Sequence, residues 1–249
     1  MADHILLLAG TLEARQIAGE LARTYPEMRL TVSFAGVVLD LPGLGLPTRI
    51  GGFGGANGFA DYLRTENVGL VIDATHPFAA QMSTNAVKAC DINGIPLIRL
   101  ERPAWAAAPG DNWQHVGSMA DAAAALPAGA RAFLAVGRKE VFRFTERADI
   151  YGLARMIEAP VAALPEHWDL VLARPPATAD AEIDLLRAHA ISHVVSKNSG
   201  GTRSYAKIEA ARRLELPVIM IDRPNLPETI TAPDKTTVLA LVKTLLSQS

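Results

Sequence analysis

The sequence predicts an α/β protein with two Rossmann-like parallel-sheet domains and a ligand crevice between them. Short apolar runs alternate with segments of helical spacing along the chain, which is typical of parallel sheets with right-handed crossovers. One β–α–β pattern also occurs twice, around Val71–Phe78 (VIDATHPF) and around Val194–Gly201 (VVSKNSGG). The register of the repeat is close to constant, since Asp61 and Asp184 are 123 positions apart and Pro103 and Pro224 are 121 apart. Ligands bind at the carboxyl ends of strands in such sheets, so both copies are candidate sites.

The first domain is expected over residues 1–103. Its first strand is the apolar run His4–Ala9, which Gly10 ends, and such a run is typical of a strand buried on both faces. The helical spacing of Ile17 and Leu21 indicates that a helix follows. The same alternation predicts helices over 12–24, 59–67 and 78–93, and strands over 30–35, 69–74 and 96–100.

The second domain is expected over residues 116–249, after a connection over 101–115 that carries two Pro and two Trp residues. Gly137 ends one of its strands, and a helix is expected to begin at Arg138 and Lys139. The alternation predicts further helices over 118–126, 180–189, 202–214 and 236–246. It predicts strands over 130–136, 150–156, 170–173, 193–196 and 217–221.

The composition excludes several classes of function. A net charge of −2 argues against binding nucleic acid through bulk electrostatics. The only cysteine, Cys90, excludes an intramolecular disulfide and a cysteine-cluster metal site, and the six scattered histidines show no metal-ligand spacing. The start of the chain lacks the basic flank and the apolar length of a signal peptide or membrane span. We therefore expect a cytoplasmic protein with no metal, no nucleic acid and no membrane as partner.

The turn after the first strand is the first candidate for a ligand site. Gly10 allows close backbone approach and the following helix start favours a phosphate, although a lone glycine is a weak dinucleotide signature. No acid follows the second strand before Asp40, whereas Ser33 and Arg49 suit a 2′-phosphate. If a dinucleotide binds, NADPH is therefore expected. The alternative is that Arg49 is a solvated loop residue.

Two further features lie at the expected edge of the same sheet. Gly51 and Gly52 belong to a cluster of four glycines within five residues, which indicates either a solvent loop or a close approach to a ligand. His76, next to Thr75, is expected to point toward the crevice, where it could contact a nicotinamide or donate a proton. A capping histidine with a structural hydrogen bond is the alternative interpretation.

Cations gather at the expected strand ends of the second domain. The set consists of Arg138, Lys139, Lys197, Arg203 and Lys207. Arg203 and Lys207 are expected four residues apart on one helix face. Ser199 and Gly200 belong to a segment that favours a backbone nest for anions. Five cations near one sheet edge in an almost neutral protein indicate a polyanionic ligand that carries carboxylates or phosphates.

Four segments then appear together in a specific order. They are Gly10–Arg15 (GTLEAR), Asp73–Ala79 (DATHPFA), Lys197–Gly201 (KNSGG) with Lys207 and Ala210–Arg212, and Pro217–Pro224 (PVIMIDRP). In this combination the chain resembles the precorrin-6A reductase family of cobalamin biosynthesis, and the resemblance spans nearly the whole sequence. The loop Arg174–Ala177 (RPPA) departs from the family pattern. The way in which this loop closes over substrate is therefore not implied by the resemblance.

The resemblance implies an NADPH-dependent oxidoreductase that reduces the precorrin-6A macrocycle to precorrin-6B by hydride transfer and protonation. The implied substrate is a tetrapyrrole polycarboxylate, and transient contact with neighbouring pathway enzymes is expected. The residues assigned to NADPH are Gly10, Thr11, Leu12, Glu13, Arg15, Ser33, Arg49, Gly51, Gly52, Thr75 and His76. The residues assigned to substrate are Arg138, Lys139, Lys197, Ser199, Gly200, Arg203 and Lys207. The reverse assignment of the two ligands stays open.

Three alternatives to this function also stay open. The substrate could be the cobalt-bearing form, cobalt-precorrin-6A. The chain could instead be a non-catalytic two-lobed anion-binding protein, or a nucleotide-transforming enzyme with the same basic crevice. No catalytic residue is identified, and His76, Tyr205 and water are the candidate proton donors.

Overall fold

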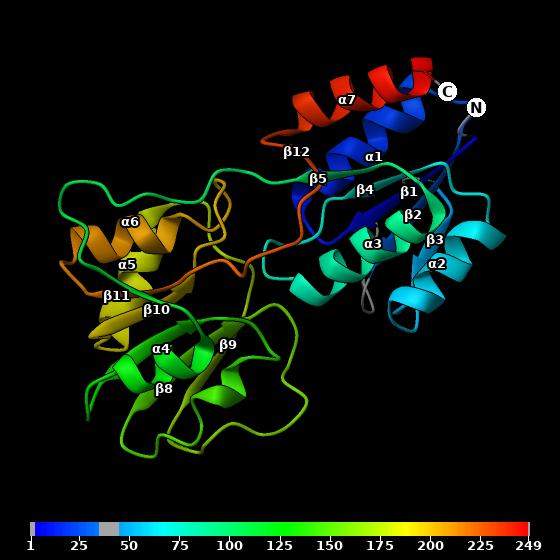
Figure 1. The fold of residues 1–249 in the computed structure, drawn as a ribbon. Helices are drawn as coiled ribbons and strands as arrows, with labels where there is room; N and C mark the ends of the chain where they lie inside the picture. Colours follow the sequence, from blue (N-terminus) through cyan, green and yellow to red (C-terminus); the bar gives the residue numbers. More distant parts are fainter. Residues whose placement is uncertain (1–2, 35–44, 249) are drawn as a thin grey trace. The chain divides into compact units, whose positions relative to one another are not determined.

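The computed structural model describes residues 3–34 and 45–248 (Figure 1). They form two compact units, one that runs up to Arg102 and resumes at Asn225, and one that spans Pro103–Pro224. Each unit contains one six-stranded sheet, and every neighbouring pair of strands is parallel. The α/β fold class with two parallel-sheet domains is thus confirmed.

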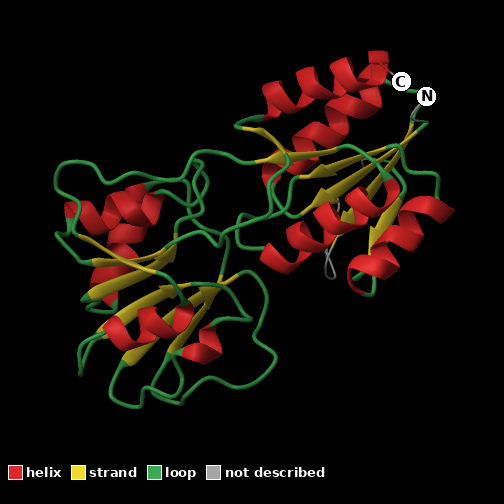
Figure 2. Ribbon diagram, viewed as in Figure 1, coloured by secondary structure: helices red, strands yellow, loops and turns green. Residues whose placement is uncertain are grey.

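The first unit has the strand order β12-β5-β4-β1-β2-β3. Its strands are β1 (His4–Ala9), β2 (Arg29–Phe34), β3 (Thr48–Ile50), β4 (Leu70–Asp73), β5 (Leu97–Leu100) and β12 (Ile230–Ala232). Its helices are α1 (Leu12–Thr24), α2 (Gly55–Thr65), α3 (Ala80–Asn93) and α7 (Lys235–Gln248). Helices cover both faces of the sheet (Figure 2), which is why every residue of the central strands β1 and β4 is buried.

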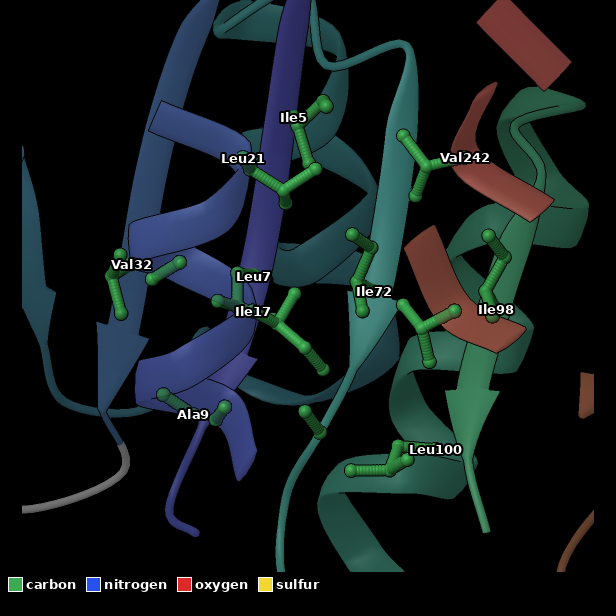
Figure 3. Packing of buried hydrophobic residues seen from close by; sticks show 14 of the residues in the cluster. Ile5, Leu7, Ala9, Ile17, Leu21, Val32, Ile72, Ile98, Leu100 and Val242 are labelled. Carbon is green, nitrogen blue, oxygen red and sulfur yellow. The ribbon is translucent and has the colours of Figure 1, made fainter. Parts of the chain in front are cut away.

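Alternate residues of β1 face the two helical layers. Leu7 packs with Ile17 of α1 and Val242 of α7 in one apolar cluster (Figure 3). Its neighbour Leu6 belongs to a second cluster with residues of α2 and α3, such as Phe59. The period of two along a strand therefore divides one apolar run between two cores.

The second unit has the strand order β6-β11-β10-β7-β8-β9. Its strands are β6 (Trp113–Val116), β7 (Arg131–Ala135), β8 (Tyr151–Met156), β9 (Asp169–Leu172), β10 (His193–Lys197) and β11 (Val218–Ile221). Its helices are α4 (Met119–Ala125), α5 (Ala179–Ala188) and α6 (Ala206–Arg213), with one 3-10 turn, η1 (Val141–Arg143). Helices α5 and α6 pack on one face of the sheet through a cluster that includes Ile183, Ile208 and Phe133.

The two sheets share one layout, with β1 to β5 in the places that β7 to β11 take in the second sheet. The sixth strand comes from a different point of the chain in each sheet. β6 precedes the other strands of its sheet in the sequence, whereas β12 follows the other strands of its own sheet. The repeated β–α–β pattern of the sequence thus corresponds to β4-α3-β5 and β10-α6-β11.

The structure corrects the expected boundary of the second domain, 116–249. Residues from Asn225 onward belong to the first unit, and the second unit begins already at Pro103. The physical reason is that β12 pairs with β5, with Ile230 beside Ile98, and that α7 buries Val238 against the core of the first sheet. The closing helix was predicted, but its attachment to the first sheet was not.

Several elements differ from the expected ones. Strands β3, β6 and β12 were not predicted, because each is a short edge strand with few buried residues and no apolar run. The helix expected over 202–214 begins only at Ala206, since Gly200 and Gly201 both have positive φ and a turn follows them. The helix expected at Arg138 is instead a turn followed by η1.

Candidate functional site

In the first unit, the turns after β1 and β4 lie side by side at the carboxyl edge of the sheet. The Thr11 hydroxyl caps α1 by accepting from the Ala14 N–H at 3.2 Å, and it donates to the Ala74 carbonyl at 2.9 Å. A Cβ atom on Gly10 would be 3.8 Å from the backbone nitrogen of His76 and 3.9 Å from the Thr75 Cα. The structure therefore brings Gly10, Thr11, Thr75 and His76 together, as the sequence predicted for strands on either side of a topological switch point.

A salt bridge neutralises the acid in the first turn of α1. Arg102 donates to the Glu13 carboxylate at 2.9 Å, and both side chains are largely buried. Without a cation, Glu13 would repel a phosphate at this helix start. Arg102 was not among the candidate residues, although it follows β5 at the same sheet edge. Of the other predicted residues here, Leu12 is exposed and Arg15 is half-buried on α1.

Arg49 holds the glycine-rich loop. Its guanidinium donates to the carbonyls of Gly51 and Gly52, at 2.6 Å each, and lies 3.8 Å from the centre of the Phe53 ring. Strand register places Arg49 of β3 beside Ser33 of β2, and Ser33 is buried. These predicted residues thus share one corner of the first unit. The adjoining segment 35–44, which includes Asp40, lies outside the described residues.

Asp73 at the end of β4 organises the DATHPFA segment. Its Oδ1 accepts from the Thr75 N–H at 3.2 Å and from the Thr75 hydroxyl at 2.7 Å. Arg99 of β5 lies 3.6 Å from the other carboxylate oxygen, and both charged side chains are buried. His76 accepts through Nδ1 from the Phe78 N–H at 3.2 Å, so a neutral imidazole carries its proton on Nε2. The structural hydrogen bond expected of His76 is therefore present, but it closes the turn before α3 and does not cap that helix. A proton-donor role is compatible with it.

In the second unit, the segment Lys197–Gly201 follows β10 and is tightly bonded to its surroundings. The Asn198 side chain is buried and exchanges two hydrogen bonds with the backbone of Trp105, at 2.8 and 3.0 Å. Arg223 donates to the carbonyls of Asn198 and Ser199, at 3.0 and 3.2 Å. Burial lowers the pKa of the Lys197 ammonium. Trp105, Asn198 and Arg223 were not predicted as site residues, although Asn198 lies inside the KNSGG motif.

The predicted cations do not all reach the sheet edge. Arg138 and Lys139 lie in the turn after β7, where Arg138 pairs with Glu158 at 2.6 Å. Arg203 is exposed in the turn before α6. Lys207 is only 3% exposed and donates to the Ser204 carbonyl at 2.7 Å. The expectation that Arg203 and Lys207 share a helix face is wrong, because α6 begins three residues after Arg203.

Lys207 instead belongs to a buried charged cluster. Arg155 of β8 donates to the Glu182 carboxylate of α5 at 2.6 Å, and both side chains are almost fully buried. Burial lowers the pKa of Lys207 to about 7, with a further contribution from the positive charge of Arg155. Lys207 therefore supports the second unit from inside, and a direct role in binding substrate requires a different side-chain conformation.

We expect Lys207→Met to stabilise the protein near pH 7 and to lose this advantage as the pH rises. An unfolded lysine titrates near pH 10.4, whereas burial lowers the pKa of Lys207 in the folded chain to about 7. Between these values the unfolded chain binds a proton that the folded chain has released. The wild-type free energy of unfolding should therefore rise with pH, by at most about 1.4 kcal/mol per unit from this group.

Urea unfolding of the wild type and Lys207→Met from about pH 7 to about pH 10 measures this difference. Lys88→Met is the matched control, because Lys88 is exposed on α3. Parallel stability curves for the wild type and Lys207→Met would contradict the prediction.

No helix among residues 3–34 and 45–248 is long and apolar enough to cross a membrane. Over the same residues, no group of three or more His, Cys, Asp or Glu side chains could hold a metal ion. Burial raises the pKa of the Cys90 thiol to about 12, which fits a packing residue.

The two sheets, with a capped helix start in one unit and a bonded glycine loop beside cations in the other, define an α/β protein whose strand ends carry groups suited to anionic ligands. The sequence profile described as "Precorrin-6x reductase CbiJ/CobK" matches residues 4–244. The chain belongs to this reductase family and is thus an oxidoreductase.

Individual relatives agree with this membership. The "Precorrin-6A reductase" of Rhodobacter capsulatus is 48% identical over 90% of this chain and 89% of its own length. A solved structure described as "CobK precorrin-6A reductase" is 44% identical, covers 98% of this chain and 97% of its own, and superposes with a TM-score of 0.89. A "Cobalt-precorrin-6A reductase" of Priestia megaterium is 31% identical over 89% of this chain and 91% of its own length.

Proposed function

We propose that this reductase uses NADPH to reduce precorrin-6A to precorrin-6B in cobalamin biosynthesis, in the cytoplasm. The similarity to a relative named for that reaction, 48% over 90% of the chain, carries the proposal. The relative named for the cobalt-bearing substrate is only 31% identical, which favours the metal-free substrate. A non-catalytic anion-binding protein is no longer an alternative, because the chain belongs to a reductase family.

The residues of the first unit fit a phosphorylated dinucleotide. Thr11 fixes the turn that starts α1, and Arg102 neutralises Glu13 beside it. No acidic side chain pairs with Ser33 in the strand register; its neighbour on β3 is Arg49. A hydroxyl next to a guanidinium suits a 2′-phosphate better than the diol of NADH, because the acid that usually holds the diol is replaced by a cation.

The bound nicotinamide supplies the hydride, so the protein has to hold the two rings in contact, exclude water and manage one proton. In the balanced reaction the hydride of NADPH and one solvent-derived proton add to two atoms of the macrocycle, and NADP⁺ is released. His76, with its proton on Nε2, is the candidate that could move this proton, and water is the other. The Tyr205 hydroxyl accepts from Arg212 at 2.6 Å and keeps its own proton, so Tyr205 stays the third candidate.

The cations and loop donors of the second unit support its role as the substrate domain. A tetrapyrrole with acetate and propionate groups needs several donors around its rim. Arg138, Lys139, Lys197 and Arg203 lie in turns or at strand ends where such groups could reach them. Ser199 and Gly200 contribute the loop between these cations.

The test follows NADPH absorbance after precorrin-6A is added to the enzyme, with NADH and cobalt-precorrin-6A in parallel. We expect rapid oxidation with NADPH and the metal-free substrate, and at least tenfold slower oxidation in the other combinations. Faster reaction with the cobalt-bearing substrate would reject the metal-free assignment. Equal rates with NADH and NADPH would reject the cofactor assignment.

Arg49→Met should raise the KM for NADPH about tenfold or more and leave the KM for NADH unchanged. A hydrogen bond to a charged group contributes about 1.5–3 kcal/mol, and only NADPH carries the phosphate that would make it. Steady-state kinetics with both cofactors measures the effect. The control is Arg64→Met on α2, since Arg64 is exposed and forms a surface salt bridge with Asp61.

The comparison of cofactors separates phosphate recognition from loop distortion. If Arg49→Met acted only by releasing Gly51 and Gly52, both KM values would rise together. That result would remove Arg49 from the proposed phosphate site.

A further inference from the structure

We propose that Trp105 is a positioning residue, which holds the segment Lys197–Gly201 in the shape that binds a carboxylate of the substrate. Trp105 lies in the segment that precedes β6, about ninety residues from the loop in the sequence. The inference rests on the function proposed above, because the ligand assigned to this loop is a carboxylate of the proposed substrate.

Three hydrogen bonds join Trp105 to the loop. The Trp105 N–H donates to the Asn198 side-chain oxygen at 2.8 Å, and the Asn198 amide donates back to the Trp105 carbonyl at 3.0 Å. The indole Nε1–H donates to the Gly201 carbonyl at 2.7 Å. Two of these bonds use backbone atoms of Trp105, so only the third depends on its side chain.

Packing fixes the Trp105 ring from the side of α6. The Lys207 Nζ lies 5.0 Å from the ring centre, and the Tyr205 ring meets it edge-on at 5.6 Å. Arg212 holds the Tyr205 hydroxyl at 2.6 Å and forms a two-pronged salt bridge with Asp111, at 2.9 Å for each contact. The indole is thus a rigid support for the loop, because its neighbours are themselves fixed.

These contacts occupy the carbonyl oxygens of the loop with protein donors. Arg223 binds the carbonyls of Asn198 and Ser199, Trp105 binds that of Gly201, and the Ser199 N–H binds that of Lys197. Four carbonyl oxygens that would repel an anion are therefore paired with protein donors.

The loop keeps donors for a ligand. Within residues 3–34 and 45–248, the N–H groups of Gly200 and Gly201 have no hydrogen-bond acceptor. Lys197 is the last residue of β10 and begins the same loop. A loop whose acceptors are occupied and whose amides are available has the polarity of an anion-binding nest.

A carboxylate of the macrocycle and a phosphate of the cofactor share this chemistry, and we assign the loop to the carboxylate. In the first unit, Thr11 fixes the turn before α1 and Arg102 neutralises Glu13, which together suit a phosphate. The segment Lys197–Gly201 of the second unit lacks such an arrangement. Apart from Lys207, the predicted cations of this unit lie instead in separate turns and at the end of β10, which suits several carboxylates on one large ligand better than a single phosphate.

The test is Trp105→Phe, which keeps an aromatic ring but removes the bond to the Gly201 carbonyl. We expect the KM for precorrin-6A to rise about tenfold, with kcat within about twofold and the KM for NADPH unchanged. Trp168→Phe is the matched control, because the Trp168 indole also donates to a backbone carbonyl, that of Ile150 at 3.2 Å. It should lower the Tm to a similar degree and leave both KM values unchanged.

The possible failures can be told apart. A rise in the KM for NADPH instead would reassign the loop to a cofactor phosphate, and unchanged KM values in Trp105→Phe would overturn the inference. If the wild type did not oxidise NADPH, the proposed function would fail first. Equilibrium dialysis with precorrin-6A alone would then still test the loop, with about tenfold weaker binding by Trp105→Phe expected and equal binding against it.

Discussion

Gly200→Ala is expected to weaken precorrin-6A binding by more than tenfold and to destabilise the second unit by about 2–5 kcal/mol. A Cβ atom at this position would lie 2.2 Å from the Pro103 carbonyl oxygen and 2.5 Å from the Arg223 guanidinium. The residue also has a φ of +65°, which an alanine adopts only at a cost. The loop must shift away from Pro103, and it then loses the Arg223 contacts that occupy its carbonyl groups.

Gly129→Ala is the control that separates the steric clash of a Cβ atom from the cost of a positive φ. Gly129 precedes β7 with a φ of +75°, and nothing lies within 4 Å of a Cβ atom there. It should therefore cost only the left-handed backbone penalty of roughly 1–2 kcal/mol, with unchanged kinetics. Urea unfolding and the KM for precorrin-6A measure both effects. If the two variants lost equal stability and Gly200→Ala kept its KM, the close approach at Gly200 would not shape the binding loop.

The fold could be predicted from the sequence because the central strands β1 and β4 are largely apolar runs and because the β–α–β pattern occurs twice. A run such as His4–Ala9 is buried on both faces, so its composition alone indicates a parallel sheet with helices on either side. The short edge strands carry no such pattern. β12 has three residues, two of them exposed, and its pairing with β5, together with the packing of α7 on the first core, attaches the end of the chain to the first unit.

The candidate site was predictable only where a residue lies at or just beyond the carboxyl end of a strand. Lys197 ends β10, and Gly10, Thr75 and Gly200 lie shortly after the ends of β1, β4 and β10. Such strand ends meet at one edge of a parallel sheet. Trp105 had no such signal, because its partners lie far away in the sequence and its segment has no periodic pattern.

Helix periodicity misplaced Lys207 for a related reason. A lysine four residues after an arginine in a helical pattern is normally solvated. Here α6 starts late and Arg155 and Glu182 reach the same interior from β8 and α5, so a position that looks like surface is part of a charged core. Only the packing of three separate elements could show this.

Glu182→Gln is expected to lower the free energy of unfolding by about 3–5 kcal/mol, the largest loss of stability that we predict for a single charge. Glu182 is fully buried, and Arg155, at 4% side-chain exposure, donates to it at 2.6 Å. Glutamine has nearly the same shape, so no cavity forms. The variant instead leaves Arg155 buried without a negative charge, and Lys207 loses the carboxylate that favours its protonated form.

The same reasoning predicts that Arg155→Met would restore much of the loss when combined with Glu182→Leu, because an apolar pair of similar volume does not have to be desolvated as ions. Asp180→Asn is the control on the same helix, since Asp180 forms an exposed pair with Arg213 and such pairs contribute only about 0–1 kcal/mol. Urea unfolding at one pH compares these three variants with the wild type. A double variant no more stable than Glu182→Gln would contradict this prediction, because the loss in Glu182→Gln could then not be attributed to the unpaired charge of Arg155.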